Sequence, residues 1–179
     1  HAAEFAQTND CPAAPAALPA GATCTIQVVF KPAATGEETA ALSISDNAPG
    51  SPQSVPLSGT AAPPAPALKL TPANLNFGDQ AVGTASTPQV ITLANTGSAT
   101  LNLTSSITIG GENAAEFKLV AEKTTCPVNG GQLQPGVSCV LGVSFAPAAV
   151  GAKTAQVIIV DDAEGSPHPV PLAGAATPK

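Results

Sequence analysis

The chain repeats its C-terminal part near its N-terminus. Residues 11–63 align without a gap to residues 126–178, at a constant offset of 115, and 25 of the 53 aligned positions are identical. A repeat of this length indicates an array of similar domains rather than one large fold. The architecture is therefore well constrained, whereas nothing in the repeat names a ligand.

Only the second copy of the repeat is complete. The five residues from His1 match the five from Asn113, but Leu68–Asn113 has no earlier counterpart. We therefore predict the C-terminal half of a repeat in residues 1–61, a Pro-rich linker in residues 62–67 and a complete repeat in residues 68–176. The linker composition is typical of a semi-rigid, extended spacer. Because the first residue is not Met, we expect the chain to be an internal or processed piece of a longer protein.

Short segments with alternating hydrophobicity predict an all-β fold. We expect strands at residues 68–70, 74–77, 89–94, 101–109, 139–145, 154–160 and 170–174. Turns are expected at Gly78-Asp79 and at residues 161–167, and one helical turn at residues 114–117. Pro169 and Pro171 favour an edge position for the last strand. About seven short strands in a unit of this size are typical of an Ig-like antiparallel sandwich. The predicted fold class is thus tandem Ig-like sandwiches, one complete and one a C-terminal half unit.

Period-two alternation also predicts which side chains face inward. The predicted core of the complete unit consists of Phe77, Ile91, Leu93, Leu103, Leu141, Val143, Phe145, Val157, Ile159 and Leu172. The half unit has the matching apolar face at Ile26, Val28, Phe30, Leu42 and Ile44. Such a face and its open edges invite pairing with further strands. We expect those strands to come from a neighbouring molecule, a swapped copy or an upstream part of the parent; the alternative is packing on the complete unit.

The four cysteines fall two in each copy, and each pair has 12 residues between its members. Zinc sites have closer cysteine pairs or nearby histidines. We therefore predict the disulfides Cys11–Cys24 and Cys126–Cys139, which imply an oxidising compartment. The alternative is four reduced, buried thiols in a cytosolic protein.

The charge pattern argues against nucleic-acid and anionic-membrane partners. The formal net charge is −6, and the six basic residues are scattered lysines, whereas nucleic-acid binding requires a clustered basic face. The apolar runs are too short for a transmembrane helix. No signal peptide is visible in the sequence.

One turn carries the best candidates for a metal site. Asp161, Asp162 and Glu164 are weak calcium candidates, because calcium prefers loops rich in oxygen ligands. The matching turn of the first copy has only one carboxylate, Asp46, so a bare turn is the favoured interpretation. His168 corresponds to Gln53, which favours a polar strand residue over a general base. The sequence has no G-x-S-x-G motif. We expect no catalytic residues and no cofactor, and hence no enzyme.

Several motifs of the complete unit together carry a family resemblance. They are residues 75–84 (LNFGDQAVGT), 90–97 (VITLANTG), 133–139 (LQPGVSC), 143–147 (VSFAP) and 170–174 (VPLAG). This pattern resembles the bacterial choice-of-anchor D repeat, which is related to ASH and hydin-type Ig-like domains and, more distantly, to the major sperm protein fold. The resemblance implies tandem units in large secreted or surface proteins, with no known catalytic residues.

The expected function is a structural or adhesive module of a secreted or cell-surface bacterial protein, acting as a stalk or display scaffold. Expected partners are neighbouring Ig-like repeats or copies of the same chain, through strand complementation of the half unit. One alternative is a self-assembling extracellular fibre subunit completed by strands of a neighbouring chain. A second is an accessory polysaccharide-binding module of an extracellular enzyme. The expected location is extracellular, at the cell surface, or in the periplasm.

Overall fold

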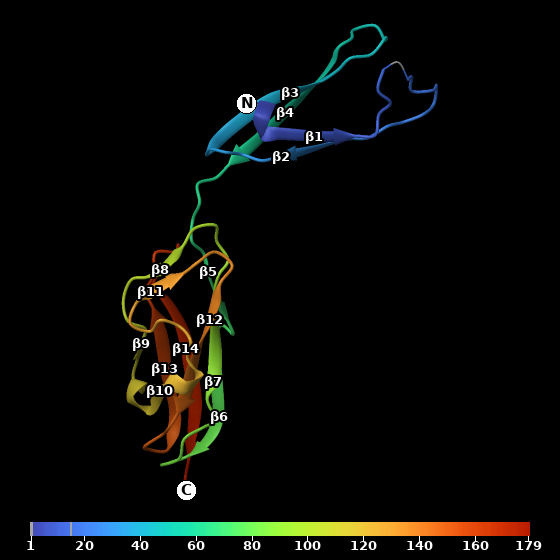
Figure 1. Cartoon of the computed structure of the whole chain (residues 1–179). Coiled ribbons are helices and arrows are strands. Elements are labelled where there is room, and N and C mark those ends of the chain that lie inside the picture. The colour runs from blue at the N-terminus through green and yellow to red at the C-terminus, as the bar shows by residue number, and fades with distance from the viewer. Residues whose placement is uncertain (1, 15) are drawn as a thin grey trace. The chain divides into compact units, whose positions relative to one another are not determined.

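The computed structural model describes residues 2–14 and 16–179, and the chain divides into two compact units. Unit 1 comprises residues 1–63 and unit 2 comprises residues 64–179. The described parts of both units consist of β-strands, turns and single 3₁₀ turns (Figure 1). None of these helical turns has the length or the hydropathy needed to cross a membrane.

Unit 2 is a sandwich of two four-stranded sheets, as the sequence predicts. The first sheet has the order β10 (Phe117–Leu119), β12 (Ser138–Phe145), β7 (Gln89–Asn95), β5 (Leu68–Thr71). The second has the order β6 (Leu75–Ala81), β14 (His168–Thr177), β13 (Gly151–Ile159), β9 (Thr108–Gly110). Neighbouring strands are antiparallel except β6 and β14, which run parallel. A small two-stranded sheet joins β8 (Leu101–Leu103) to β11 (Gly131–Leu133), and the 3₁₀ turns are η2 (Ala114–Glu116) and η3 (Ala121–Lys123).

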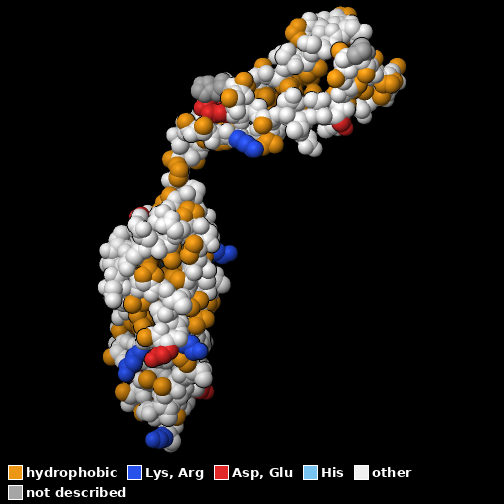
Figure 2. Space-filling model, in the orientation of Figure 1, with side chains coloured by type: hydrophobic (Ala, Val, Ile, Leu, Met, Phe, Trp, Pro, Cys, Tyr) orange, Lys and Arg blue, Asp and Glu red, His pale blue; other side chains and the backbone are white. Residues whose placement is uncertain are grey.

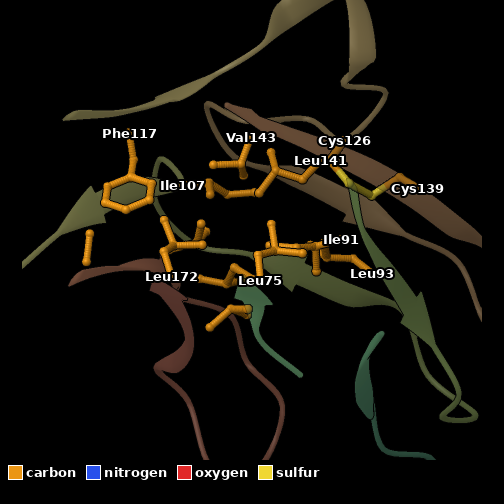
Figure 3. Packing of buried hydrophobic residues seen from close by; sticks show 14 of the residues in the cluster. Leu75, Ile91, Leu93, Ile107, Phe117, Cys126, Cys139, Leu141, Val143 and Leu172 are labelled. Carbon is orange, nitrogen blue, oxygen red and sulfur yellow. A yellow bond between two sulfur atoms is a disulfide. The ribbon is translucent and has the colours of Figure 1, made fainter. Parts of the chain in front are cut away.

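The core of unit 2 lies between the two sheets, where alternate residues of each strand face inward. Leu141 and Val143 of the first sheet and Leu172 of the second are at most 1% exposed (Figure 3). Nine of the ten predicted core residues are buried, and Phe77 is half-buried against the same cluster. The core also includes residues that the prediction omitted, namely Leu75, Leu101, Ile107, Phe117, Leu133 and Val170.

Three local predictions for unit 2 were wrong. The segment 101–109 is two strands, because residues 104–107 lead the chain from β8 to β9 in another sheet. Gly78 is not part of a turn between strands: it lies inside β6 with φ +63°, next to a register shift against β14. A glycine at positive φ is typical of a β-bulge. The last strand is not an edge, since β14 lies between β13 and β6, although pairing with β6 starts only at Leu172, after both prolines.

Unit 1 contains the same C-terminal half as two antiparallel strand pairs. One pair joins β1 (Phe5–Asn9) to β2 (Ile26–Phe30), and the other joins β3 (Gly36–Ile44) to β4 (Gln53–Ala61). The 3₁₀ turn η1 (Ala2–Glu4) precedes them. These elements correspond in order to β10, β12, β13, β14 and η2 of unit 2.

The two copies share their internal contacts as well as their strands. The Phe30 ring stacks on Phe5 at a centroid distance of 4.9 Å, and Phe145 stacks on Phe117 at 4.7 Å. Gly59 lies against the Phe30 ring, so that a Cβ atom there would approach the ring to 2.6 Å. Gly174 is placed in the same way, with 2.5 Å to the Phe145 ring. The repeat therefore preserves a stacked aromatic pair together with the glycine that makes room for it.

The core assignment can be tested at Phe145. This side chain is fully buried in unit 2, so that Phe145→Ala removes the ring and leaves a cavity. We expect a loss of about 3–5 kcal/mol in the free energy of unfolding, measured by urea denaturation followed by circular dichroism. Val150→Ala, at a side chain that is 60% exposed, is the control and is expected to change stability by less than about 0.5 kcal/mol. Equal stability of the two variants would contradict the assignment.

Candidate functional site

The most unusual surface of the described residues is the apolar face of unit 1. Val28 is 37% exposed, whereas its counterpart Val143 is 0% exposed. Val55 is 44% exposed, whereas its counterpart Val170 is 0% exposed. The other predicted inward residues of unit 1 (Ile26, Phe30, Leu42, Ile44) are half-buried, although their counterparts in unit 2 are fully buried. The same side chains that form a core in unit 2 thus form a surface in unit 1.

This surface is hollowed between the two strand pairs of unit 1. A hollow of about 150 Å³ is lined by side chains from both pairs, among them Phe5, Val28, Leu42 and Leu57. Figure 2 shows hydrophobic side chains at the surface of unit 1 and few charged ones. We call this region, from Ile26, Val28, Phe30, Leu42, Ile44, Val55 and Leu57, the open face. Its chemistry suits an apolar partner that also brings backbone donors and acceptors.

The three calcium candidates of unit 2 point to different partners. Asp162 accepts hydrogen bonds from the backbone and side-chain nitrogens of Asn102, the backbone one at 2.8 Å. Asp161 accepts a 2.8 Å hydrogen bond from the backbone of Ala163, and Glu164 is exposed. Among the described residues, the only group of three or more potential ligands that lie together is Asp10, Cys11 and Cys24. Both of its sulfurs belong to a disulfide, so they cannot serve as thiolate ligands.

The turn around Asp161 has the same construction in both copies. The Ser166 hydroxyl accepts a hydrogen bond from the Asp161 backbone at 2.9 Å, and Ser51 does the same for Asp46. Each aspartate also accepts a bond from the backbone two residues on, at 2.8 Å. This agrees with the interpretation of the segment as a hydrogen-bonded turn. The copies differ only in the strand that follows, where His168 Nε2 lies 3.4 Å from Asp161 Oδ1.

Both expected disulfides are present, Cys11–Cys24 and Cys126–Cys139. In unit 2 the disulfide lies beside the core, and both cysteines are under 10% exposed (Figure 3). In unit 1 both cysteines are half-buried. Next to them is a polar hollow lined by Thr8, Asn9, Asp10, Thr25 and Gln27. Its polar groups already bond to one another, since Asp10 accepts from the Thr25 backbone and Asn9 from the Cys11 backbone.

Asn95 is a buried polar residue whose role the sequence analysis did not predict. Its side chain is 1% exposed and makes four hydrogen bonds. The amide nitrogen donates to the carbonyls of Ala99 (2.8 Å) and Leu133 (2.9 Å). The carbonyl oxygen accepts from the backbones of Gly97 (3.0 Å) and Ala67 (3.4 Å). Asn95 therefore ties the end of the Pro-rich segment to the body of unit 2.

The Pro-rich segment is held by further backbone contacts. The backbones of Ser98 and Ala99 donate to the Ala65 carbonyl at 2.9 and 3.2 Å, and Thr96 donates to the Ala67 carbonyl at 2.8 Å. Gly97 permits this approach, because a Cβ atom there would lie 2.3 Å from the Ala65 carbonyl oxygen. Residues 65–67, predicted as part of a linker, thus belong structurally to unit 2.

An ion pair of unit 2 is not repeated in unit 1. Lys153 Nζ lies 2.9 Å from Glu116 Oε1, and both side chains are largely buried. The equivalent positions in unit 1 are Glu38 and Glu4. The two copies therefore share their apolar and backbone contacts but differ in charge at this position.

The sandwich of unit 2, with its parallel β6–β14 pair and its Asn95 turn, is an Ig-like domain of the ASH and PapD-like class. A family profile described as Cep192 domain 4 matches residues 65–177. The chain therefore belongs to the Cep192 domain 4 family. The match supports the ASH and Ig-like fold family expected from the sequence; it does not single out the bacterial choice-of-anchor D repeat. No curated protein sequence matches the chain significantly.

Solved structures with similar folds come from several organisms. The ASH/PapD-like domain 7 of human CEP192 is 14% identical, covers 67% of this chain and 92% of its own, and has a TM-score of 0.46. A protein of unknown function from Porphyromonas gingivalis W83 is 14% identical, covers 96% and 84%, and has a TM-score of 0.49. WR4, a C. elegans MSP family member, is 10% identical, covers 62% and 97%, and has a TM-score of 0.38. At these values we infer nothing about function from them.

Asn95 offers a test of how the Pro-rich segment is held. In Asn95→Ala, two carbonyls and two backbone N–H groups lose their partner, and we expect unit 2 to lose about 2–4 kcal/mol of unfolding free energy. Hydrogen exchange should also become faster at the Ala67 and Gly97 amides. The control is Asn129→Ala, at an exposed asparagine for which we expect no change in either measurement. If Asn95→Ala leaves both amides equally protected, the side chain does not hold the segment.

Asp162 offers a test of the turn by its titration. Its side-chain hydrogen bond from Asn102, followed by the backbone bond from the same residue, holds the pKa of Asp162 below the usual 3.8. A lowered folded-state pKa means that the carboxylate stabilises the fold above pH 3.8 and that this contribution is lost as the pH falls through the folded pKa. We expect Asn102→Ala to move the pKa back toward 3.8 in an NMR titration, with Asn129→Ala as the unchanged control. An unshifted pKa in Asn102→Ala would contradict this origin.

Proposed function

We propose that the chain is a structural module of a secreted or cell-surface protein, acting as part of a stalk or display scaffold built from tandem repeats. The observation that carries this proposal is the repetition itself. Two back halves, 115 residues apart in sequence, keep the same strands, the same aromatic pair and the same hydrogen-bonded turn. Repetition of an entire set of structural contacts is typical of spacer and scaffold arrays.

Two features of unit 2 support a scaffold role. The segment before β5 is held against the 95–99 turn, which shortens the free connection to the preceding unit. The disulfide Cys126–Cys139 closes a loop beside the core, and disulfides are retained in oxidising compartments outside the cytosol. Both features support an extracellular, surface or periplasmic location. We also propose that the chain is not an enzyme, because its conspicuous polar groups already serve the turns.

An alternative is supported by the open face of unit 1. A fibre subunit that accepts strands from a neighbouring chain would expose such a face before assembly. The polysaccharide-binding alternative has less support, because such sites commonly use exposed aromatic side chains. Phe117 and Phe145 are buried here, and Phe5, Phe30 and Phe77 are half-buried.

The scaffold role can be tested in the cell that produces the protein. An epitope tag is placed ahead of unit 1, and its accessibility to antibody is measured at the surface. Deletion of residues 64–179 should lower accessibility, and an unrelated Ig-like domain of similar size in their place should restore it. Failure of the replacement to restore accessibility would show that unit 2 contributes a specific surface and is not a spacer.

The proposed compartment can be tested through the cysteines. Free thiols are alkylated at the moment of lysis, and the peptides are mapped by mass spectrometry without reduction. We expect the Cys11–Cys24 and Cys126–Cys139 linkages in the surface, periplasmic or extracellular fraction. Alkylated cysteines at all four positions would contradict the proposed location.

A further inference from the structure

Three strand edges that are paired in unit 2 have no strand beside them in the described part of unit 1. In unit 2, β12 has β7 on its free side, β14 has β6 and β13 has β9. Their counterparts β2, β4 and β3 belong to two-stranded sheets only. These edges therefore offer backbone donors and acceptors along two sides of the open face.

Unit 2 shows what covers such a face. Its front half consists of β5 to β9, residues 68–110, and supplies Leu75, Ile91 and Leu93 to the core. It also supplies Phe77, whose ring lies 5.7 Å from Phe117 and 6.0 Å from Phe145. In unit 1 the matching pair Phe5–Phe30 lacks this third ring among the described residues.

We propose that the open face of unit 1 binds the front half of a neighbouring repeat of the same array, in the register seen in unit 2. This inference rests on the proposed scaffold function and names the partner of that scaffold. The occupant is a segment of about 43 residues with three strands patterned like β6, β7 and β9. Its chemistry is defined by two apolar strands and one aromatic side chain that completes the ring cluster.

The register of the complex follows from the repeat offset. In unit 2, Leu141 lies opposite Ile91 and Cys139 lies opposite Leu93. The corresponding residues of β2 are Ile26 and Cys24, which would therefore face the occupant's equivalents of Ile91 and Leu93. On the other sheet, Leu172 pairs with Leu75 in a parallel arrangement, so Leu57 of β4 would take the equivalent of Leu75.

A second copy of this chain is a poorer occupant. These 179 residues contain two back halves and one front half. A front half moved from unit 2 of one copy to unit 1 of another would open a new face identical in kind to the one it closes. Exchange between copies therefore leaves the number of open faces unchanged, whereas a front half from an additional repeat removes one.

The experiment extends the chain by its own front half. Residues 65–112 are added ahead of residue 1, so that Glu112 of the added segment precedes His1 as it precedes Asn113 in unit 2. Hydrogen exchange is measured by mass spectrometry at β2 and β4, with β12 and β14 as internal references. We expect exchange in β2 and β4 to become slower by about 100-fold or more, because closing the sandwich replaces local opening with cooperative unfolding.

The matched control carries Ile91→Asp and Leu93→Asp in the added segment only. We expect β2 and β4 of this control to exchange as fast as in the chain without the extension. Unchanged exchange on extension, or equal slowing by the control, would overturn the proposal.

The unextended chain tests the other occupants. Slow exchange in β2 and β4 together with a concentration-dependent dimer in sedimentation would assign the open face to a second copy. Slow exchange in a monomer would show that the chain already covers this face itself. Either result would overturn the proposal, whereas fast exchange in a monomer supports it. All of these outcomes leave the scaffold role untouched, because the display experiment depends on unit 2.

Discussion

The structure of this chain depends on the burial of one apolar sheet face by another. In unit 2 the front half covers Leu141, Val143 and Val170, and these side chains reach zero exposure. Burying a side chain of this size contributes on the order of 2 kcal/mol each, so a handful of such contacts exceeds the net stability of many domains. In unit 1 the same contacts are half made. The difference between the two units is therefore the presence of a covering sheet and not the quality of the strands.

Local polar contacts fix the details that burial leaves open. Apolar contacts are non-directional, and they do not determine where a strand begins or how a turn is held. Asn95 does so for the entry of unit 2, and the Asp161 turn with its Ser166 partner does so between β13 and β14. The same turn at Asp46 keeps its geometry in unit 1 although the apolar face there is open. Turn chemistry in this family is thus independent of core completion.

Much of the fold could be predicted from the sequence, because period-two alternation and the repeat report directly on strands and their inward faces. The errors arose where tertiary contacts decide. The split of residues 101–109 depends on which sheet receives each strand, and the bulge at Gly78 depends on a parallel neighbour far away in sequence. Asn95 was missed because an Asn-Thr-Gly sequence is typical of any turn. The candidate site was predictable as an apolar face, since Val28 and Val143 occupy equivalent positions, but its shape and edges required coordinates.

The parallel pairing of β6 with β14 has a mechanical consequence. The chain enters unit 2 ahead of β6 and leaves it after β14, so tension along the chain draws these strands in opposite directions. Because the strands run parallel, the pairs from Leu75–Leu172 to Ala81–Thr177 lie along the direction of pull and are sheared together. A hairpin such as β3–β4, pulled from its open end, would instead separate one pair at a time. Unit 2 thus resists extension most strongly along the axis on which a tandem array would transmit force.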